Sequence, residues 1–436
     1  MIANFKHYQK LLVLGVCLFC IQSLSAQKLD KKEKKMVQYV DDHIDEAIDF
    51  LEKAVNINSG TLHKEGVQEV GRLFRPELEA LGMEVTWVDM PEEVNRGGHM
   101  IAEHKGSKGK RILMIGHFDT VFEKDSPFQK WEKLSDKKAK GPGANDMKGG
   151  DVVLLYALKA LHAAGAMDNT QIIVVYTGDE EKPGSPQTIS RKDLIEAGKR
   201  SDIALGFEGG KAGRAVVARR GSSGWQLSVK GTRWHSSQIF SEQVGSGAIF
   251  EMARILNAFH EKVKGEEYLT FNPGVVLGGT GVNFDKANSK GTAFGKTNVV
   301  AQRVVVDGGI RTISQDQLER AQAKMKEIVE NGNHPGTSAS IEFSEGYPAM
   351  YPEEENYELL KVYDQISQDL GFEAIEPYDP GARGAADIAF VSFIPALGGL
   401  GSYGAGGHTF NETVELDTFH IAVKRAALLL YRLTRE

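Results

Sequence analysis

Histidine and carboxylate side chains stand directly after three short apolar stretches of the sequence. These polar residues are His117, Asp119, Asp179, Glu180, Glu181 and Glu208. The apolar stretches read RILMIG, QIIVVYTG and DIALGF, a pattern typical of strands that are buried on both faces. Imidazole and carboxylate ligands without any thiolate suit zinc or a similar divalent ion in a catalytic site.

Two glycine-rich segments add further polar residues: GPGANDMKGGD carries Asp146, and GAGGHTFNE carries His408. Each motif alone has an ordinary structural explanation, because a His-x-Asp at a strand end commonly forms a turn and an acidic triplet is commonly solvated. Together, however, they would crowd several carboxylates into one crevice, where like charges oppose ionisation unless a cation is present. The sequence therefore predicts a metal centre, and two ions that share one carboxylate would lie about 3.5–4 Å apart.

The apolar stretches alternate with helical patterns, one of which is VVLLYALKALHAAG at residues 152–165. This alternation predicts an α/β fold with a mainly parallel sheet covered by helices on both faces. In such a sheet the carboxyl ends of the strands meet at one crevice, so the side chains that follow them should converge there.

The pattern changes near residue 212, where AVVARRGSSGWQLSVKG and later segments alternate like antiparallel strands and are joined by two helices. We expect an inserted α+β module within residues 212–346. The catalytic domain would then comprise residues 27–211 and 347–436.

The first 26 residues resemble a signal peptide, with two lysines, an eleven-residue apolar core and a small residue at the expected cut. We expect export, to the periplasm or beyond, with no membrane span after cleavage. Both cysteines of the chain, Cys17 and Cys20, fall in this segment, so a disulfide or a cysteine nucleophile is not expected. The net charge of −7 and the absence of a long basic block argue against nucleic acid as a partner.

The ordered motifs HFDTV, GPGANDMKGG, DEE and GGHTFNE resemble those of the co-catalytic zinc metallopeptidase family that includes glutamate carboxypeptidase, acetylornithine deacetylase and succinyl-diaminopimelate desuccinylase. The glutamate carboxypeptidase-like members are the most similar in pattern. The resemblance runs over nearly the whole chain after residue 26. It implies a zinc exopeptidase-like fold and an inserted ferredoxin-like domain that serves as lid and dimerisation surface.

The resemblance also implies two zinc ions, or another divalent metal. His117 and Glu208 would bind one ion, Glu181 and His408 would bind the other, and Asp146 would bridge them. Asp119 would orient His117, and Glu180 would be the general base for a hydroxide that bridges the metals. The spacing of the residues does not by itself decide which of Glu180 and Glu181 is the base. Asp179 is expected to be structural.

Four further residues are candidates for contact with substrate. By the resemblance, His235 would stabilise the oxyanion from the partner subunit of a homodimer, and Asn298 and Arg311 would hold the substrate. Arg383 stands in RGAAD, where the family usually has a glycine-rich turn before the last ligand, so it would contact or narrow the pocket for the substrate's carboxylate.

The favoured function is hydrolysis of an amide bond that releases a C-terminal amino acid from a small peptide or from an N-acyl amino acid. One alternative is a co-catalytic zinc aminopeptidase, which the inserted lid disfavours. Another is a non-catalytic binding protein on the same scaffold, which the presence of every ligand and of Glu180 disfavours.

Overall fold

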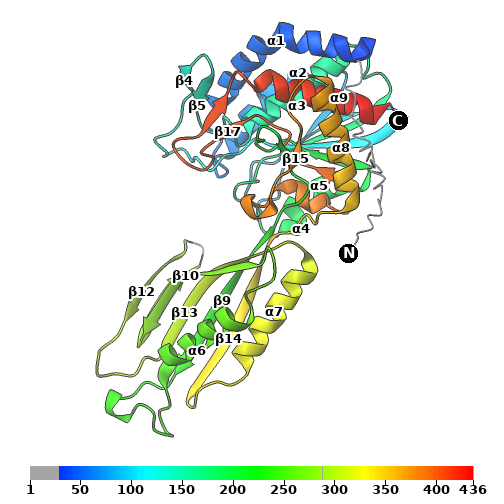
Figure 1. The fold of residues 1–436 in the computed structure, drawn as a ribbon. Helices are drawn as coiled ribbons and strands as arrows, with labels where there is room; N and C mark the ends of the chain where they lie inside the picture. The colour runs from blue at the N-terminus through cyan, green and yellow to red at the C-terminus, as the bar shows by residue number, and fades with distance from the viewer. Residues whose placement is uncertain (1–28, 287, 436) are drawn as a thin grey trace, which may run out of the picture.

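A computed structural model describes residues 29–286 and 288–435 of the chain. The structure has two domains, and the smaller one projects from one end of the larger one (Figure 1). The predicted signal segment, residues 1–26, lies outside the described residues. In the described part of the chain, none of the helices is both long and apolar enough to span a membrane.

The larger domain is built on a six-stranded sheet. In spatial order its strands are β1 (Glu84–Val88), β2 (His99–His104), β6 (Thr170–Thr177), β3 (Lys108–His117), β7 (Ile203–Gly206) and β16 (Ala396–Leu397). The last four run parallel to one another, whereas β2 is antiparallel to both of its neighbours. The predicted α/β class with a mainly parallel sheet is therefore confirmed.

Alternate side chains of the central strand β3 enter two different apolar cores, because successive residues of a strand point to opposite faces. Ile112 and Met114 pack on one face, and Leu113 and Ile115 on the other. The first face is covered by α1 (Lys31–Val55), α2 (Lys64–Glu79), α3 (Lys148–Ala163), α8 (Glu354–Asp369) and α9 (Phe419–Thr434). The second is covered by α5 (Lys192–Lys199), which follows the short α4 (Gln187–Ser190), and by the 3₁₀-helix η3 (Asp387–Val391).

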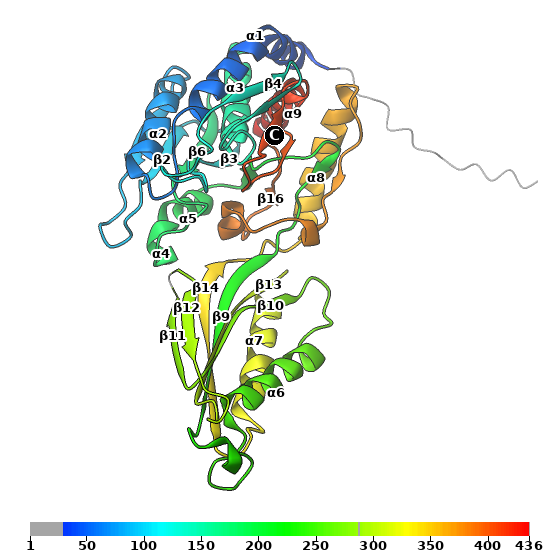
Figure 2. The same ribbon diagram turned by 90° about the vertical axis from the view of Figure 1, so that its left-hand side faces the viewer.

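The smaller domain is a four-stranded antiparallel sheet with two helices on one face (Figure 2). Its sheet order is β10 (Thr270–Gly279), β13 (Arg303–Thr312), β9 (Gly221–Gly231) and β14 (Thr337–Tyr347). The helices α6 (Gly247–Lys262) and α7 (Gln315–Glu330) follow β9 and β13 and share an apolar core with the sheet. A ribbon of β11 (Gly281–Asp285) and β12 (Lys290–Phe294) extends from β10. The order strand, helix, strand, strand, helix, strand is ferredoxin-like, and we call this unit the lid domain.

A small sheet in the larger domain brings together two loops that are distant in sequence. Its strands, in order, are β17 (Gly404–Ala405), β18 (Thr413–Glu415), β5 (Lys138–Lys140) and β4 (Glu132–Ser135). Because Thr413 pairs with Lys140, the loop between β17 and β18 lies beside the loop that leads into α3. A further pair, β8 (Arg214–Ala215) with β15 (Glu376–Pro377), lies near the connection to the lid domain.

Candidate active site

The carboxyl ends of β3, β6 and β7 converge with the two loops of the small sheet. His117 ends β3, Glu181 lies just beyond β6, and Glu208 follows β7. Asp146 precedes α3, and His408 lies between β17 and β18. These five side chains form two overlapping groups whose ligand atoms lie within 4.8 Å of one another: His117 with Asp146 and Glu208, and Asp146 with Glu181 and His408.

Asp146 occupies the centre of the cluster and presents one oxygen to each group. Its Oδ1 lies 3.7 Å from Nε2 of His117, and its Oδ2 lies 3.1 Å from Nε2 of His408. On the far sides, His117 Nε2 lies 3.6 Å from Glu208 Oε1, and His408 Nε2 lies 3.0 Å from Glu181 Oε2. A carboxylate between two imidazoles is the geometry that a bridging ligand needs.

One buried nitrogen of the cluster has no hydrogen-bond partner among the described residues. Nε2 of His117 is buried and makes no hydrogen bond to any described residue, although it faces three carboxylates at 3.6–3.9 Å. A buried polar nitrogen normally has a partner, and these separations are too long for hydrogen bonds. A cation between the imidazole and the carboxylates would satisfy all of these atoms, so the donor set fits a divalent metal.

The pKa values of the side chains in the cluster also favour a bound cation. Burial would lower the pKa of His117, but the neighbouring carboxylates, first that of Asp119, hold it well above its usual value. Hydrogen bonds to Asp146 and Glu181 raise the pKa of His408 to about 11. Burial raises the pKa of Glu181 to about 7. These pKa values favour positive charge at the site, which a bound metal would supply.

Glu180 points toward the same cluster. Its Oε2 lies 3.9 Å from Nε2 of His117, and burial, together with the negative charge of Glu208, raises its pKa well above the usual value. A carboxyl group with a raised pKa beside a metal cluster is suited to accept and return a proton near neutral pH.

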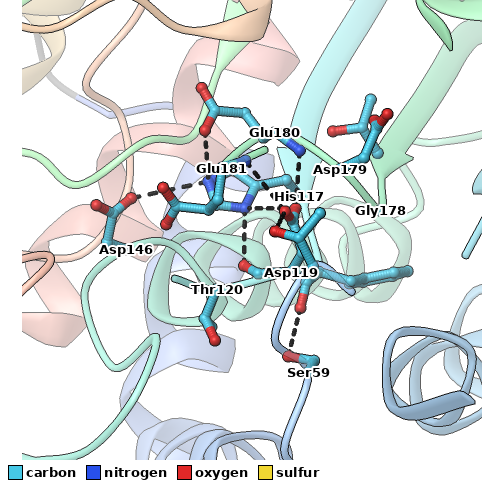
Figure 3. A network of polar contacts seen from close by, with 12 residues as sticks. Ser59, His117, Asp119, Thr120, Asp146, Gly178, Asp179, Glu180 and Glu181 are labelled. Carbon is cyan, nitrogen blue, oxygen red and sulfur yellow. Dashed lines mark hydrogen bonds and ion pairs between the residues drawn. The ribbon is translucent and has the colours of Figure 1, made fainter. Parts of the chain in front are cut away.

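Asp119 is buried beneath His117 and fixes the loop that carries both glutamates (Figure 3). Its carboxylate accepts hydrogen bonds from the backbone N–H of Glu180 at 2.9 Å and of Glu181 at 3.0 Å. The hydroxyl of Thr61 donates a third at 2.6 Å. Nδ1 of His117 lies 3.0 Å from the carbonyl oxygen of Asp119 and 3.4 Å from its carboxylate. Asp119 therefore orients the histidine mainly through its backbone carbonyl, and both acidic residues of the loop through its carboxylate.

Asp179 takes no part in the cluster. It is fully buried, forms an ion pair with the equally buried Arg191, and accepts the backbone N–H of Gly184 at 2.8 Å. The first acid of the triplet anchors the loop, and the next two face the site.

Glu412 is a structural residue that sequence reasoning missed. Its buried carboxylate accepts hydrogen bonds from the backbone N–H groups of Gly143, Asn145 and Asp146 at 2.9–3.2 Å. It thereby ties the loop of Asp146 to the loop that carries His408. The only signal was its place in GGHTFNE, four residues after the histidine.

Arg219 was also missed, and it lies beside the predicted Arg383. Both line a cavity of about 270 Å³ together with Asp146, Glu180 and His408. Arg219 is 2% exposed; its Nη1 donates to the carbonyl of Gly384, but Nε and Nη2 have no partner among the described residues. Nη2 of Arg383 donates to the carbonyl of Gly209, and its Nε is likewise unpartnered.

The three lid residues lie apart from this cluster within one chain. His235 and Asn298 are neighbours, since the N–H of Ser236 donates to the carbonyl of Asn298. Arg311 lies near the end of β13. All three are exposed, and none lines the cavity beside Asp146.

Comparisons with known proteins agree with this architecture. A family model described as Peptidase family M20/M25/M40 matches residues 113–432, a range that holds all five cluster residues and the lid domain. Carboxypeptidase G2 of Pseudomonas sp. (strain RS-16) is 27% identical over 354 residues, which cover 79% of each chain.

Two solved structures share the fold. Aminopeptidase PepT of Bacillus cereus matches with a TM-score of 0.69 at 18% identity, covering 89% of this chain and 98% of that one. The YXEP protein of Bacillus subtilis, described as a dinuclear metal binding peptidase, matches with a TM-score of 0.61 at 14% identity, covering 90% and 99%.

The fold and the cluster define a metal-dependent hydrolase with an inserted lid. The chain belongs to peptidase family M20/M25/M40, and it is a peptidase or amidohydrolase. The predicted resemblance is confirmed. The likeness to PepT extends over so much of the chain that it includes the lid, so the lid alone does not exclude an aminopeptidase.

Proposed function

We propose that the protein hydrolyses an amide bond and releases an amino acid that bears a free carboxylate, from a small peptide or an N-acyl amino acid. The observation that carries this proposal is the position of Asp146 between His117 and His408, with the carboxyl group of Glu180 beside them. In this proposal His117 and Glu208 hold one divalent ion, Glu181 and His408 hold another, and Asp146 bridges them. Zinc suits this mixture of imidazole and carboxylate, and other divalent ions remain candidates.

A bound metal pair would polarise the scissile carbonyl and make water acidic enough to attack near neutral pH. Glu180 accepts the proton of the attacking water and returns it to the departing amine. Asp119 keeps Glu180 in place through its hydrogen bond to the backbone N–H, and it keeps His117 in the tautomer that leaves Nε2 free for metal.

Two guanidinium groups at the cavity support the proposal that the carboxylate end of the substrate enters it. Arg219 and Arg383 line the cavity beside Asp146 and Glu180, and each carries at least one buried N–H group that has no partner among the described residues. A carboxylate on the substrate would accept these N–H groups with charge assistance, whereas the ammonium group of an aminopeptidase substrate would be repelled. This favours release of a C-terminal amino acid over the aminopeptidase alternative.

The lid residues are proposed to act across a dimer. Large apolar side chains stand exposed on the lid beside His235, among them Trp234 at 43%, Phe240 at 67% and Phe250 at 53%. The rings of Phe240 and Phe250 lie 5.6 Å apart, so they form one patch. A partner seated on this patch would bring His235 and Asn298 toward the partner's metal cluster, while Arg311 would hold substrate. Sedimentation that shows only monomer at micromolar concentration would remove this role.

Export is proposed from the signal-like pattern of residues 1–26. Amino-terminal sequencing of protein recovered from the periplasm or the medium should begin at residue 27. Full-length protein retained in the cytoplasm would contradict export.

The reaction is tested by following amine release from dipeptides, C-terminally varied peptides and N-acyl amino acids after chelation and reloading with Zn²⁺. Release should require metal and should be lost in Glu180→Gln, which keeps the size of the side chain and removes the base. Tyr431→Phe, far from the site, serves as the control. Turnover only of substrates with a free amino terminus and a blocked carboxylate would favour the aminopeptidase, and metal binding without any turnover would favour the binding protein.

A further inference from the structure

Tyr347 is the last residue of β14, where the chain leaves the lid domain and re-enters the catalytic domain (Figure 2). Its pairing with β9 is irregular between Ser344 and Tyr347. Just beyond, Met350 exchanges backbone hydrogen bonds with Arg219 on the outgoing segment. Tyr347 therefore stands on one of the two segments that connect the domains.

The hydroxyl of Tyr347 is part of a buried network in the catalytic domain. It donates to the backbone carbonyl of Glu180 at 2.7 Å, with Oδ1 of Asp387 as a more distant acceptor at 3.2 Å, and it accepts a hydrogen bond from Nη2 of Arg191 at 2.8 Å. Arg191 in turn is held by Asp387 through Nε at 2.7 Å and by Asp179. The central guanidinium of this network is fully buried between two carboxylates.

The backbone of Glu180 is consequently fixed from two sides. Asp119 accepts its N–H at 2.9 Å, and Tyr347 donates to its carbonyl oxygen. The first contact comes from the catalytic domain itself, and the second comes from the residue at which β14 of the lid domain ends. A change in lid angle that displaced Tyr347 would act directly on the peptide group of Glu180.

The surroundings of Tyr347 leave room for such a displacement. It lines a cavity of about 500 Å³ between α7 of the lid and α4 of the catalytic domain. It also lines a second cavity of about 450 Å³ that is bordered by Pro183 and Gly224. Empty space beside a connecting segment allows that segment to move without steric conflict with packed side chains.

We infer that Tyr347 is a positioning residue that couples the orientation of the lid domain to the placement of Glu180. With the lid in the orientation of this structure, the hydroxyl holds the carbonyl of Glu180 and the side chain faces the metal cluster. This inference rests on the proposed role of Glu180 as general base. The lid would then act on Glu180 through the connecting segment that carries Tyr347. This effect is separate from any contact between lid residues and substrate.

The test compares Tyr347→Phe, which removes only the hydroxyl, with Tyr431→Phe, which removes a hydroxyl bonded to Asp30 far from the site. We expect Tyr347→Phe to lower kcat about ten- to a hundred-fold, because a small misplacement of a catalytic group has effects of this size. KM should change less than about threefold, since no substrate contact is removed. In the metal-free protein, amide hydrogen exchange in residues 178–184 should become faster in Tyr347→Phe and stay unchanged in Tyr431→Phe.

A second variant keeps the inference testable if Tyr347→Phe fails to fold. Pro348→Gly loosens the connecting segment and removes no hydrogen-bond partner of Glu180. Coupling predicts faster exchange in residues 178–184 for this variant too. Wild-type kcat and wild-type exchange in either folded variant would overturn the inference, as would a rise in KM alone. An inactive wild-type protein whose exchange still responds to Tyr347→Phe would instead refute the proposed function and leave the coupling in place.

Discussion

Replacing Arg219 by methionine tests how the site selects its substrate. The methionine chain fills much of the volume of the arginine chain but offers no N–H group. In the protein as it stands, burial lowers the pKa of Arg219 to about 10, and the next largest cause is the nearby charge of Arg383. The guanidinium is therefore already stripped of water before substrate arrives, so binding a carboxylate adds little further desolvation cost on the protein side.

The size of the effect follows from the two unpartnered nitrogens, Nε and Nη2. A hydrogen bond to a charged group contributes about 1.5–3 kcal/mol, and two such bonds to one carboxylate are not fully additive. We take about 3 kcal/mol for the pair, which corresponds to a factor of about 150 in kcat/KM. The carboxamide analogue of the same substrate cannot form the charged pair, so its kcat/KM should fall far less.

The assay measures kcat/KM for an N-acyl amino acid and for its carboxamide, in the wild type, in Arg219→Met and in Arg220→Met. Arg220 is the matched control, because it donates to Thr270 and to the carbonyl of Gly381 and does not line the metal cavity. The preference for carboxylate over carboxamide should fall at least tenfold in Arg219→Met and persist in Arg220→Met. An equal loss of kcat/KM on both substrates in Arg219→Met would refute the reasoning. An equal fall of the carboxylate preference in Arg220→Met would refute it too.

Three further outcomes follow from the site. Asp119→Asn exchanges one acceptor oxygen for a donor that faces an N–H or a hydroxyl. Metal affinity, measured by calorimetry, should fall about 10–100-fold. Unchanged affinity would show that Asp119 does not support the ligands. Metal must displace the proton that His408 holds with a pKa of about 11. The apparent Kd for metal should therefore decrease as pH rises from 6 to 8, about tenfold per pH unit for each proton displaced. A Kd for metal that does not depend on pH would contradict this. Asp179→Asn leaves Arg191 with only Asp387 as a charged partner and should lower the free energy of unfolding by roughly 3–5 kcal/mol in urea titrations, whereas a loss below about 1 kcal/mol would mean that the pair is not essential.

The cluster was predictable because its residues follow a rule of sheet geometry. His117, Glu181 and Glu208 each follow an apolar strand, and strands that run parallel end at the same edge. The bridging position of Asp146 was implied only by family resemblance, since its loop has no periodicity from which a direction can be derived.

Other features depend on tertiary contacts that leave no local pattern. Arg219 reads as one of two adjacent arginines in a connecting segment, and only the folded chain shows that one faces the metal cavity and its neighbour does not. The pairing of Asp179 with Arg191 crosses a loop, and the contact of Arg191 with Asp387 joins residues that are far apart in the sequence. Strand β2 (His99–His104) was not identified either, because its polar ends obscure its apolar centre.

The central claim is that Asp146 bridges two divalent ions. The most direct measurement is diffraction from crystals of the zinc-loaded protein on both sides of the zinc absorption edge. The account predicts two anomalous peaks about 3.5–4 Å apart, one beside His117 and Glu208, the other beside Glu181 and His408, with Asp146 contacting both. A single peak that Asp146 does not contact, or no peak among these five residues in an active, zinc-loaded protein, would contradict it.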